Sequence, residues 1–223
     1  MISLARQLLD FILHIDTHLS HLIAQYGAWT YALLFAIIFA ETGFVITPFL
    51  PGDSLLFAAG ALSAKSGTQL NIHLLSALLW AAAVLGDSLN YWLGSKIGPK
   101  VFTRDDSFFL RKKHLERARD FFEKYGGRAI ILARFVPIVR TFVPFVAGIG
   151  KMNYARFIAY NIAGGFLWIY AFTYTGYCFG GLEIVKRNFH TVIIAIILIS
   201  VIPIVWEFWR NYSRRPKTTP TEN

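Results

Sequence analysis

The chain has 223 residues, of which 55% are hydrophobic and only 16% are charged. About a quarter of the residues of an average soluble domain are charged, so this composition indicates a membrane protein. The 22 basic and 13 acidic residues give a net charge of +9, which in an apolar chain is typical of cytoplasmic loops rather than of a nucleic-acid site. The single cysteine, Cys178, excludes an intrachain disulfide and a cysteine-based zinc cluster.

Residues 1–25 combine apolar side chains at helical spacing with scattered polar ones, a pattern that predicts an amphipathic helix lying in the membrane interface. His14, His18 and His21 share one face of this helix with Asp10. Such a cluster is compatible with a metal site or a pH sensor, but it is more typical of the polar side of an interfacial helix. We therefore expect no metal and no other cofactor.

Residues 28–62 form an apolar run whose only charges are Glu41 and Asp53. As one straight helix it would be roughly 50 Å long, against a hydrocarbon core of about 30 Å. The run also contains four residues that break helices: Gly43, Pro48, Pro51 and Gly52. We therefore predict a re-entrant hairpin of two half-length helices that meet near 43–52.

The rest of the chain alternates between apolar and basic segments. In order, these are a transmembrane helix at 74–94, a basic segment at 95–128, a second re-entrant hairpin at 129–150, transmembrane helices at 154–181 and 191–209, and a basic tail at 210–223. The positive-inside rule predicts that the basic segment and the C-terminal tail both lie in the cytoplasm. It leaves the side of the N-terminus undecided.

Matching landmarks occur in the same order in both halves of the chain. They are Tyr26-Gly27 and Tyr125-Gly126, the proline pairs Pro48/Pro51 and Pro137/Pro144, and Ala59-Gly60 and Ala147-Gly148. The two halves begin on opposite sides of the membrane under this topology, so the sequence predicts an all-α polytopic membrane protein with an inverted-topology repeat. The alternative is a chance similarity between apolar runs interrupted by Pro and Gly.

Each predicted hairpin contains one sign of charge. The first contains Glu41 and Asp53, and the second contains Arg134 and Arg140. A charge at the centre of a bilayer costs a few kcal/mol, so each needs a partner or a water-filled cavity. The two arginines would point about 120° apart on a straight helix, and a break at Pro137 would turn both inward. Facing hairpins would then bring carboxylates opposite guanidiniums.

Two interpretations of these charges are open. They are either a structural ion-pair network or the binding site of a carrier. Paired arginines bind phosphate oxygens in a fork geometry that lysine cannot match, and a carboxyl group in a cavity of low dielectric constant exchanges protons more readily near neutral pH. On the second interpretation Arg134, Arg140, Asp53 and Ser54 bind a phosphate, while Glu41 and Asp53 carry protons.

Several neighbouring residues are expected to support the site. Asp53 and Ser54 follow a Pro-Gly turn and resemble a helix start that binds anions, although a plain N-cap explains them as well. Asp87 and Asn90 are expected to face the protein interior, where an interhelical hydrogen bond is the simpler role. The breakers Pro48, Pro51, Gly52, Pro137 and Pro144 would shape the hairpins. The aromatic residues at 166–177 are expected to serve packing and interface anchoring.

Two longer motifs resemble the signatures of the DedA family. The first is Glu41 followed by Pro48-Phe49-Leu50-Pro51-Gly52-Asp53-Ser54-Leu55-Leu56-Phe57, and the second is Ala133-Arg134-Phe135-Val136-Pro137-Ile138-Val139-Arg140-Thr141-Phe142. Gly86-Asp87, Asn90-Tyr91 and the opening residues 10–16 are also similar to bacterial members. The resemblance extends over nearly the whole chain apart from the tail.

This resemblance implies a polytopic inner-membrane protein of the VTT group, which is related to eukaryotic lipid scramblases. Bacterial members are linked to the recycling of undecaprenyl phosphate, to envelope homeostasis and to the proton motive force. The acidic and arginine pairs needed for activity in relatives fall on Glu41, Asp53, Arg134 and Arg140. The partners implied are membrane lipids, a polyprenyl phosphate among them, and protons.

Three functions remain open from the sequence. The first is a proton-driven flippase that returns an anionic lipid phosphate to the cytoplasmic leaflet. The second is a membrane-embedded lipid phosphatase, but none of the six histidines lies in a hairpin, so we expect no enzyme. The third is an assembly or scaffold protein whose charges are structural. A homo-oligomer is compatible with each of the three.

Overall fold

In the computed structural model, every secondary-structure element of the described residues is an α-helix, which confirms the predicted all-α class. These residues are 15–44, 52–65, 68, 70–101, 119, 122–123, 125–188, 191–192 and 194–196. The start of the predicted interfacial helix with His14, the turn with Pro48 and Pro51, most of the basic segment 95–128, most of the predicted helix 191–209 and the tail 210–223 lie outside them.

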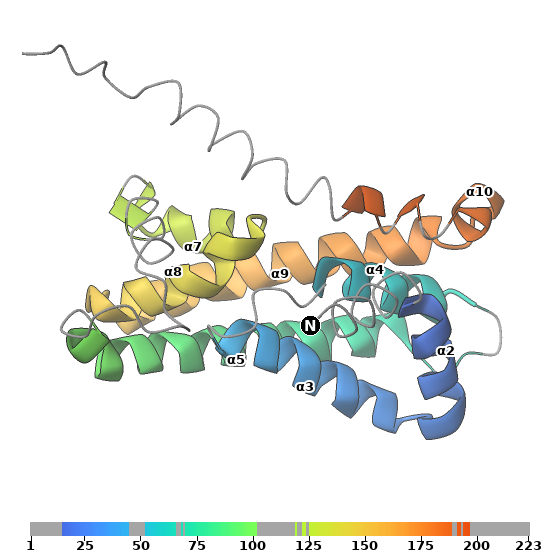
Figure 1. Ribbon diagram of the computed structural model, residues 1–223, viewed down its shortest axis with the longest axis horizontal. Helices are drawn as coiled ribbons and strands as arrows, with labels where there is room; N and C mark the ends of the chain where they lie inside the picture. The colour runs from blue at the N-terminus through green and yellow to red at the C-terminus, as the bar shows by residue number, and fades with distance from the viewer. Residues whose placement is uncertain are drawn as a thin grey trace, which may run out of the picture.

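Two long helices, α5 (Ile72–Val101) and α9 (Tyr154–Phe179), pack side by side along the longest axis of the molecule (Figure 1). With 30 and 26 residues they are about 45 and 39 Å long. Among the described residues, Ile72–Lys96 is the one helical stretch both long and apolar enough to cross a membrane. The helix at 154–181 was also predicted as a span, and α9 has the length for it.

Helix α5 is longer than the predicted 74–94 at both ends. It begins after Asn71, whose Oδ1 accepts hydrogen bonds from the backbone N–H groups of His73 and Leu74. An asparagine that satisfies the free N–H groups of a first turn is a common helix start. At the other end the helix continues seven residues past 94, into the polar segment.

Two helices lie on either side of the first expected break, α3 (Trp29–Gly43) and α4 (Gly52–Ser63). Two more flank the second, α7 (Arg128–Ala133) and α8 (Pro137–Ile149), with a break at 134–136. Pro137 occupies the first turn of α8, where its missing N–H has no intrahelical partner to lose.

The expectation that Pro144 breaks a helix is wrong. Pro144 lies inside α8, which continues to Ile149. The proline removes the hydrogen bond that its own N–H would donate to the carbonyl of Arg140, four residues earlier. Helix α8 is buried from Val139 to Gly148 and packs extensively on α5, so tertiary packing holds the helix together across this missing bond.

The second helix of each broken pair packs on the long helix that follows the other pair. Helix α4 packs on α9 and α8 packs on α5, whereas α3 packs on α5 and α7 packs on α9 (Figure 1). Both crossings depend on glycine, because a Cβ on Gly60 would collide with the Thr173 carbonyl and one on Gly148 with the Tyr91 carbonyl. Helices α4 and α8 therefore contact their long neighbours backbone to backbone.

The two Tyr-Gly landmarks have the same local structure. Helix α2 (Ile15–Tyr26) is followed by Gly27 at φ 52°, and Tyr125 is followed by Gly126 at φ 56°. Each glycine donates its N–H to the carbonyl four residues earlier, at 2.9 Å for Gly27 and 2.7 Å for Gly126. A left-handed backbone conformation after a helix is one that glycine adopts without steric cost.

Candidate functional site

The first cluster of buried charges surrounds Arg140, in the first turn of α8. Its Nη2 forms an ion pair with Oε1 of Glu41, and its Nη1 donates to Oδ1 of Asp53 at 2.7 Å. Glu41 is completely buried at the end of α3, and Asp53 is nearly buried in the first turn of α4. We call these three residues the Arg140 centre.

The break between α3 and α4 brings the two acids together, although they are twelve residues apart. The Glu41 carboxylate lies directly against Gly52, the first residue of α4, where a Cβ would collide with both of its oxygens. A carboxylate at this place also lies at the positive end of the α4 dipole. Position 52 therefore requires glycine, because any side chain there would overlap the Glu41 carboxylate.

The second cluster surrounds Arg134, in the turn directly after α7. Its Nη2 contacts Oδ2 of Asp87 at 2.5 Å, Oδ1 of Asn161 at 2.5 Å and the Ala83 carbonyl at 3.4 Å. Asp87 lies near the middle of α5 and Asn161 on α9, and Asn161 also donates to the Val84 carbonyl at 3.0 Å. We call Arg134, Asp87 and Asn161 the Arg134 centre.

Trp168 of α9 contacts both centres. Its indole Nε1 donates to Oδ1 of Asp53 at 2.9 Å, the same oxygen that Arg140 contacts. The centre of its ring lies 5.5 Å from Cζ of Arg134 and 5.1 Å from Cζ of Arg140. A guanidinium within about 6 Å of an indole face is attracted to it, so the ring stabilises both cations. The side chain is fully buried.

Asn90 joins the two pairs of broken helices. Its Nδ2 donates to the Thr42 carbonyl at the end of α3, at 3.1 Å, and to the Thr141 carbonyl in α8, at 2.6 Å. Asn90 is completely buried one turn from Asp87 on α5. A single amide on the long helix therefore satisfies a carbonyl on each side of the charge cluster.

Together the two centres contain three carboxylates and two guanidiniums, all at most 8% exposed. The ion pairs offset much of the cost of burying these charges. Four buried polar atoms of the site have no hydrogen-bond partner within the described part of the chain: Oε2 of Glu41, Nε of Arg134, Nε of Arg140 and Oδ1 of Asn90. Such atoms are uncommon in folded proteins and point to a site with a further role.

The structure brings most of the expected site residues together, with one difference in pairing. From the sequence, we expected the arginines of one hairpin to face the acids of the other. Arg140 does so, but Arg134 pairs with Asp87, for which an interhelical hydrogen bond was the simpler expectation. Ser54 is buried beside Asp53 in the first turn of α4. Pro48 and Pro51 are outside the described residues, and of Pro137 only the backbone is described.

Two residues of the site were missed. Trp168 was grouped with aromatic residues that serve packing, and Asn161 was not considered. The usable signal was the polar Asn161 inside an apolar stretch, seven residues and so two helical turns before Trp168. Gly164 lies between them on the same buried face.

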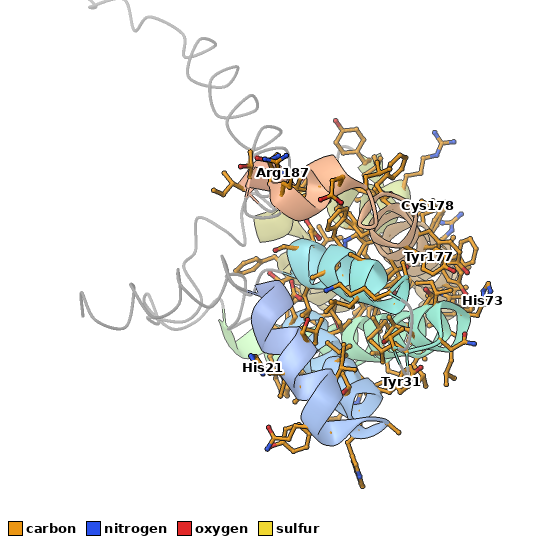
Figure 2. The ribbon with its side chains drawn as sticks, turned by 90° about the vertical axis from the view of Figure 1, so that its right-hand side faces the viewer. His21, Tyr31, His73, Tyr177, Cys178 and Arg187 are labelled. Atoms are coloured by element: carbon orange, nitrogen blue, oxygen red, sulfur yellow. The ribbon has the colours of Figure 1, made fainter. Side chains whose placement is uncertain are left out.

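The part of the chain that the structure describes contains no group of three His, Cys, Asp or Glu side chains arranged to hold a metal ion. Of the three N-terminal histidines, only the His21 side chain is described, and it is exposed on α2. Figure 2 shows His21 and His73 on the outside of the helix bundle, away from one another. The candidate site therefore consists of the buried charges and their amide and indole neighbours.

Comparisons with known proteins give a family match and relatives over most of the chain. The VTT domain family matches residues 50–178, which include Asp53, both arginines and Trp168. Protein DedA of Escherichia coli K12 is 52% identical over 204 residues, 92% of this chain and 93% of the relative. The uncharacterized membrane protein MT0380 of Mycobacterium tuberculosis is 43% identical over 187 residues, 82% of each chain, and inner membrane protein YqjA of E. coli K12 is 34% identical over 176 residues, 79% of each. No solved structure gave a significant match.

Proposed function

The chain belongs to the DedA family of VTT-domain membrane proteins, and from this premise we propose that it is an inner-membrane transporter of an anionic, phosphate-bearing lipid. The substrate class is a polyprenyl phosphate such as undecaprenyl phosphate, which the protein returns to the cytoplasmic leaflet in support of envelope homeostasis. The movement is coupled to protons and is driven by the proton motive force.

The observation that carries this proposal is the composition of the Arg140 centre. Arg140 uses both ends of its guanidinium fork, one for each carboxylate, and this is the geometry that also binds two oxygens of a phosphate. With all groups ionised, Arg140, Glu41 and Asp53 have a net charge of −1. A phosphate is repelled by this centre until a carboxyl group has taken up a proton, so the arrangement links anion binding to proton uptake.

The broken helices support a path to this site. Helix α3 has 15 residues and α4 has 12, so they are about 22 and 18 Å long and each is shorter than the hydrocarbon core. We assign α3–α4 and α7–α8 as two re-entrant hairpins of an inverted-topology repeat. The cross-packing of α4 on α9 and of α8 on α5, and the matching glycines 27 and 126, support this assignment.

The proposed topology is multi-pass with a cytoplasmic C-terminus. In a Cys178→Ser background, cysteines at Lys113 and Lys217 are expected to be shielded from an impermeant thiol reagent in intact cells. Cysteines at Lys65 and Asn188 are expected to react. Labelling at Lys113 from outside would reverse the orientation.

The transport proposal is tested with purified protein in liposomes that contain a fluorescent short-chain isoprenyl phosphate. We expect the probe to change leaflet faster than in protein-free liposomes, and faster again when a pH gradient is imposed. A rate equal to that of protein-free liposomes would overturn the proposal and favour a structural scaffold, since closed ion pairs such as Arg134–Asp87 also fasten helices together. Release of inorganic phosphate would instead indicate a phosphatase.

A further inference from the structure

Helix α9 contributes an uncharged pair, Asn161 and Trp168, to a site whose charges all come from other helices. Trp168 stands out because it touches three of the five charged residues: Asp53, Arg134 and Arg140. Its side chain is fully buried, and the helix that carries it is unbroken from Tyr154 to Phe179. The indole is therefore held by a rigid element, whereas Glu41, Asp53 and Arg140 all lie at helix ends.

We propose that Trp168 is the positioning residue that keeps hold of Asp53 when Arg140 turns from the carboxylates to the phosphate of the substrate. The geometry that carries this inference is the sharing of one oxygen, because Oδ1 of Asp53 accepts from Nη1 of Arg140 at 2.7 Å and from Nε1 of Trp168 at 2.9 Å. The inference deepens the proposed function and rests on it.

The physical reason is the cost of removing a charged donor from a buried carboxylate. If Arg140 leaves Asp53, the carboxylate loses its guanidinium donor inside the protein, where each lost hydrogen bond to a charged group is costly. The Trp168 N–H remains in place because α9 has no break near it. Arg140 thus releases Asp53 at a lower cost, and the phosphate competes more easily for the guanidinium.

Removing only the indole N–H should therefore weaken substrate binding. Without it Oδ1 of Asp53 loses one of its donors, so its pair with Arg140 becomes tighter and harder for the phosphate to displace. Trp168→Phe removes this N–H and also exchanges the indole ring beside Arg134 and Arg140 for a smaller one. We expect it to raise the apparent KM for the fluorescent isoprenyl phosphate by about tenfold or more, which matches the loss of a hydrogen bond to a charged group. The maximal rate should stay within about twofold of the wild type.

Trp80→Phe is the matched control. Trp80 also donates its indole N–H across the α5–α9 contact, to the Ile162 carbonyl at 3.0 Å, and it packs against aromatic rings of α9. No charged group is among these partners. A purely structural role for an interhelical indole bond would affect both variants alike, in their abundance and maximal rate.

A second variant keeps the test valid if Trp168→Phe misfolds. Replacing Trp168 by benzothienylalanine, an isostere with sulfur in place of the N–H, keeps the shape of the ring and removes the donor alone. A tenfold rise in KM with this isostere, and no rise with Trp80→Phe, would support the inference. If the wild type is active and the isostere leaves the KM unchanged, the role of Trp168 is overturned and the transport proposal stands. If the wild type is inactive, both are overturned.

Discussion

Arg140 and Arg134 are both buried, yet their counter-charges come from different kinds of helix. The acids that face Arg140 lie at the ends of α3 and α4, on either side of a break, and their number exceeds that of the guanidiniums at this centre. The acid that faces Arg134 lies in the middle of the continuous helix α5, and an amide from the equally continuous α9 completes the contact. The partners of Arg140 thus lie at helix ends, whereas those of Arg134 lie on unbroken helices.

This difference indicates a division of roles. Helix ends next to a break can change direction without breaking a ladder of hydrogen bonds, so the Arg140 centre is suited to exchange its partners. The Arg134 centre is electrically balanced and joins α7 to both long helices, so it is suited to hold them in place. The next four experiments test this division, beginning with the largest expected effect.

Asp87→Asn should destabilise the protein more than Asp53→Asn. The first change leaves Arg134 without its carboxylate in the interior, a loss of about 3–5 kcal/mol for a buried pair. The second leaves Arg140 with Glu41, so we expect a loss of only about 1–2 kcal/mol. Thermal unfolding of both variants in the same detergent measures the difference. Equal losses would show that the two centres have the same role in stability.

Arg140→Lys should reduce transport more than Arg134→Lys. Arg140 uses two nitrogens to reach two carboxylates, which one ammonium group cannot reproduce, whereas Arg134 reaches its acceptors through Nη2 alone. We expect about a 100-fold loss for Arg140→Lys and less than about tenfold for Arg134→Lys.

The liposome rate, corrected for equal protein abundance, and complementation of a strain lacking its DedA-family proteins both measure this effect. Full activity of both lysine variants would leave only a structural role for the arginines. A larger loss at Arg134 would assign the phosphate to the other centre.

Glu41→Gln should remove the response to a pH gradient. Glutamine keeps the size and hydrogen-bonding capacity of Glu41 but has no exchangeable charge. We expect transport down a lipid gradient to persist at a reduced rate, while the stimulation by the pH gradient is lost. In the wild type, a difference of one pH unit supports about a tenfold ratio of lipid between the leaflets if one proton accompanies each lipid. Asp87→Asn, studied at a temperature where it is folded, should retain the stimulation. Loss of stimulation in both variants would place proton exchange at both centres.

The close helix contacts at Gly60 and Gly164 give the smallest predicted difference. An alanine at Gly60 meets the Thr173 backbone, which cannot move aside, so we expect a loss of about 1–3 kcal/mol. An alanine at Gly164 meets Cα of Ile131 at 3.1 Å, and the gain in helix propensity offsets most of that crowding.

Gly181→Ala, which meets nothing within 4 Å, is the control for both changes. Unfolding curves that rank Gly164→Ala as more damaging than Gly60→Ala would show that the Arg134 side is the more tightly packed of the two.

The sequence was informative wherever a rule of membrane burial applied. The 28–62 run was too long and too interrupted for one span, and the structure has separate helices on either side of 44–51. The positions of Glu41 and Asp53 beside that break followed from the same argument. In contrast, Pro144 was expected to interrupt a helix, because local propensity takes no account of the packing of α8 on α5.

The pairing of charges was beyond what the sequence alone predicts. Nothing in the spacing of Arg134 and Asp87 shows that α7 ends beside the middle of α5, since that depends on how the helices cross. The role of Trp168 was hidden for a similar reason. One aromatic residue among many on a helix is distinguished only by the carboxylate that its N–H reaches, and that carboxylate lies 115 residues earlier in the chain.

The amide of Asn90 has a consequence for motion. Because its two N–H bonds reach the end of α3 and the start of α8, both broken elements are tied to one point on α5. As long as both bonds persist, the two carbonyls stay within hydrogen-bond distance of the same amide. A movement of one element away from this point, with the other unchanged, therefore requires the amide to release one of the two carbonyls.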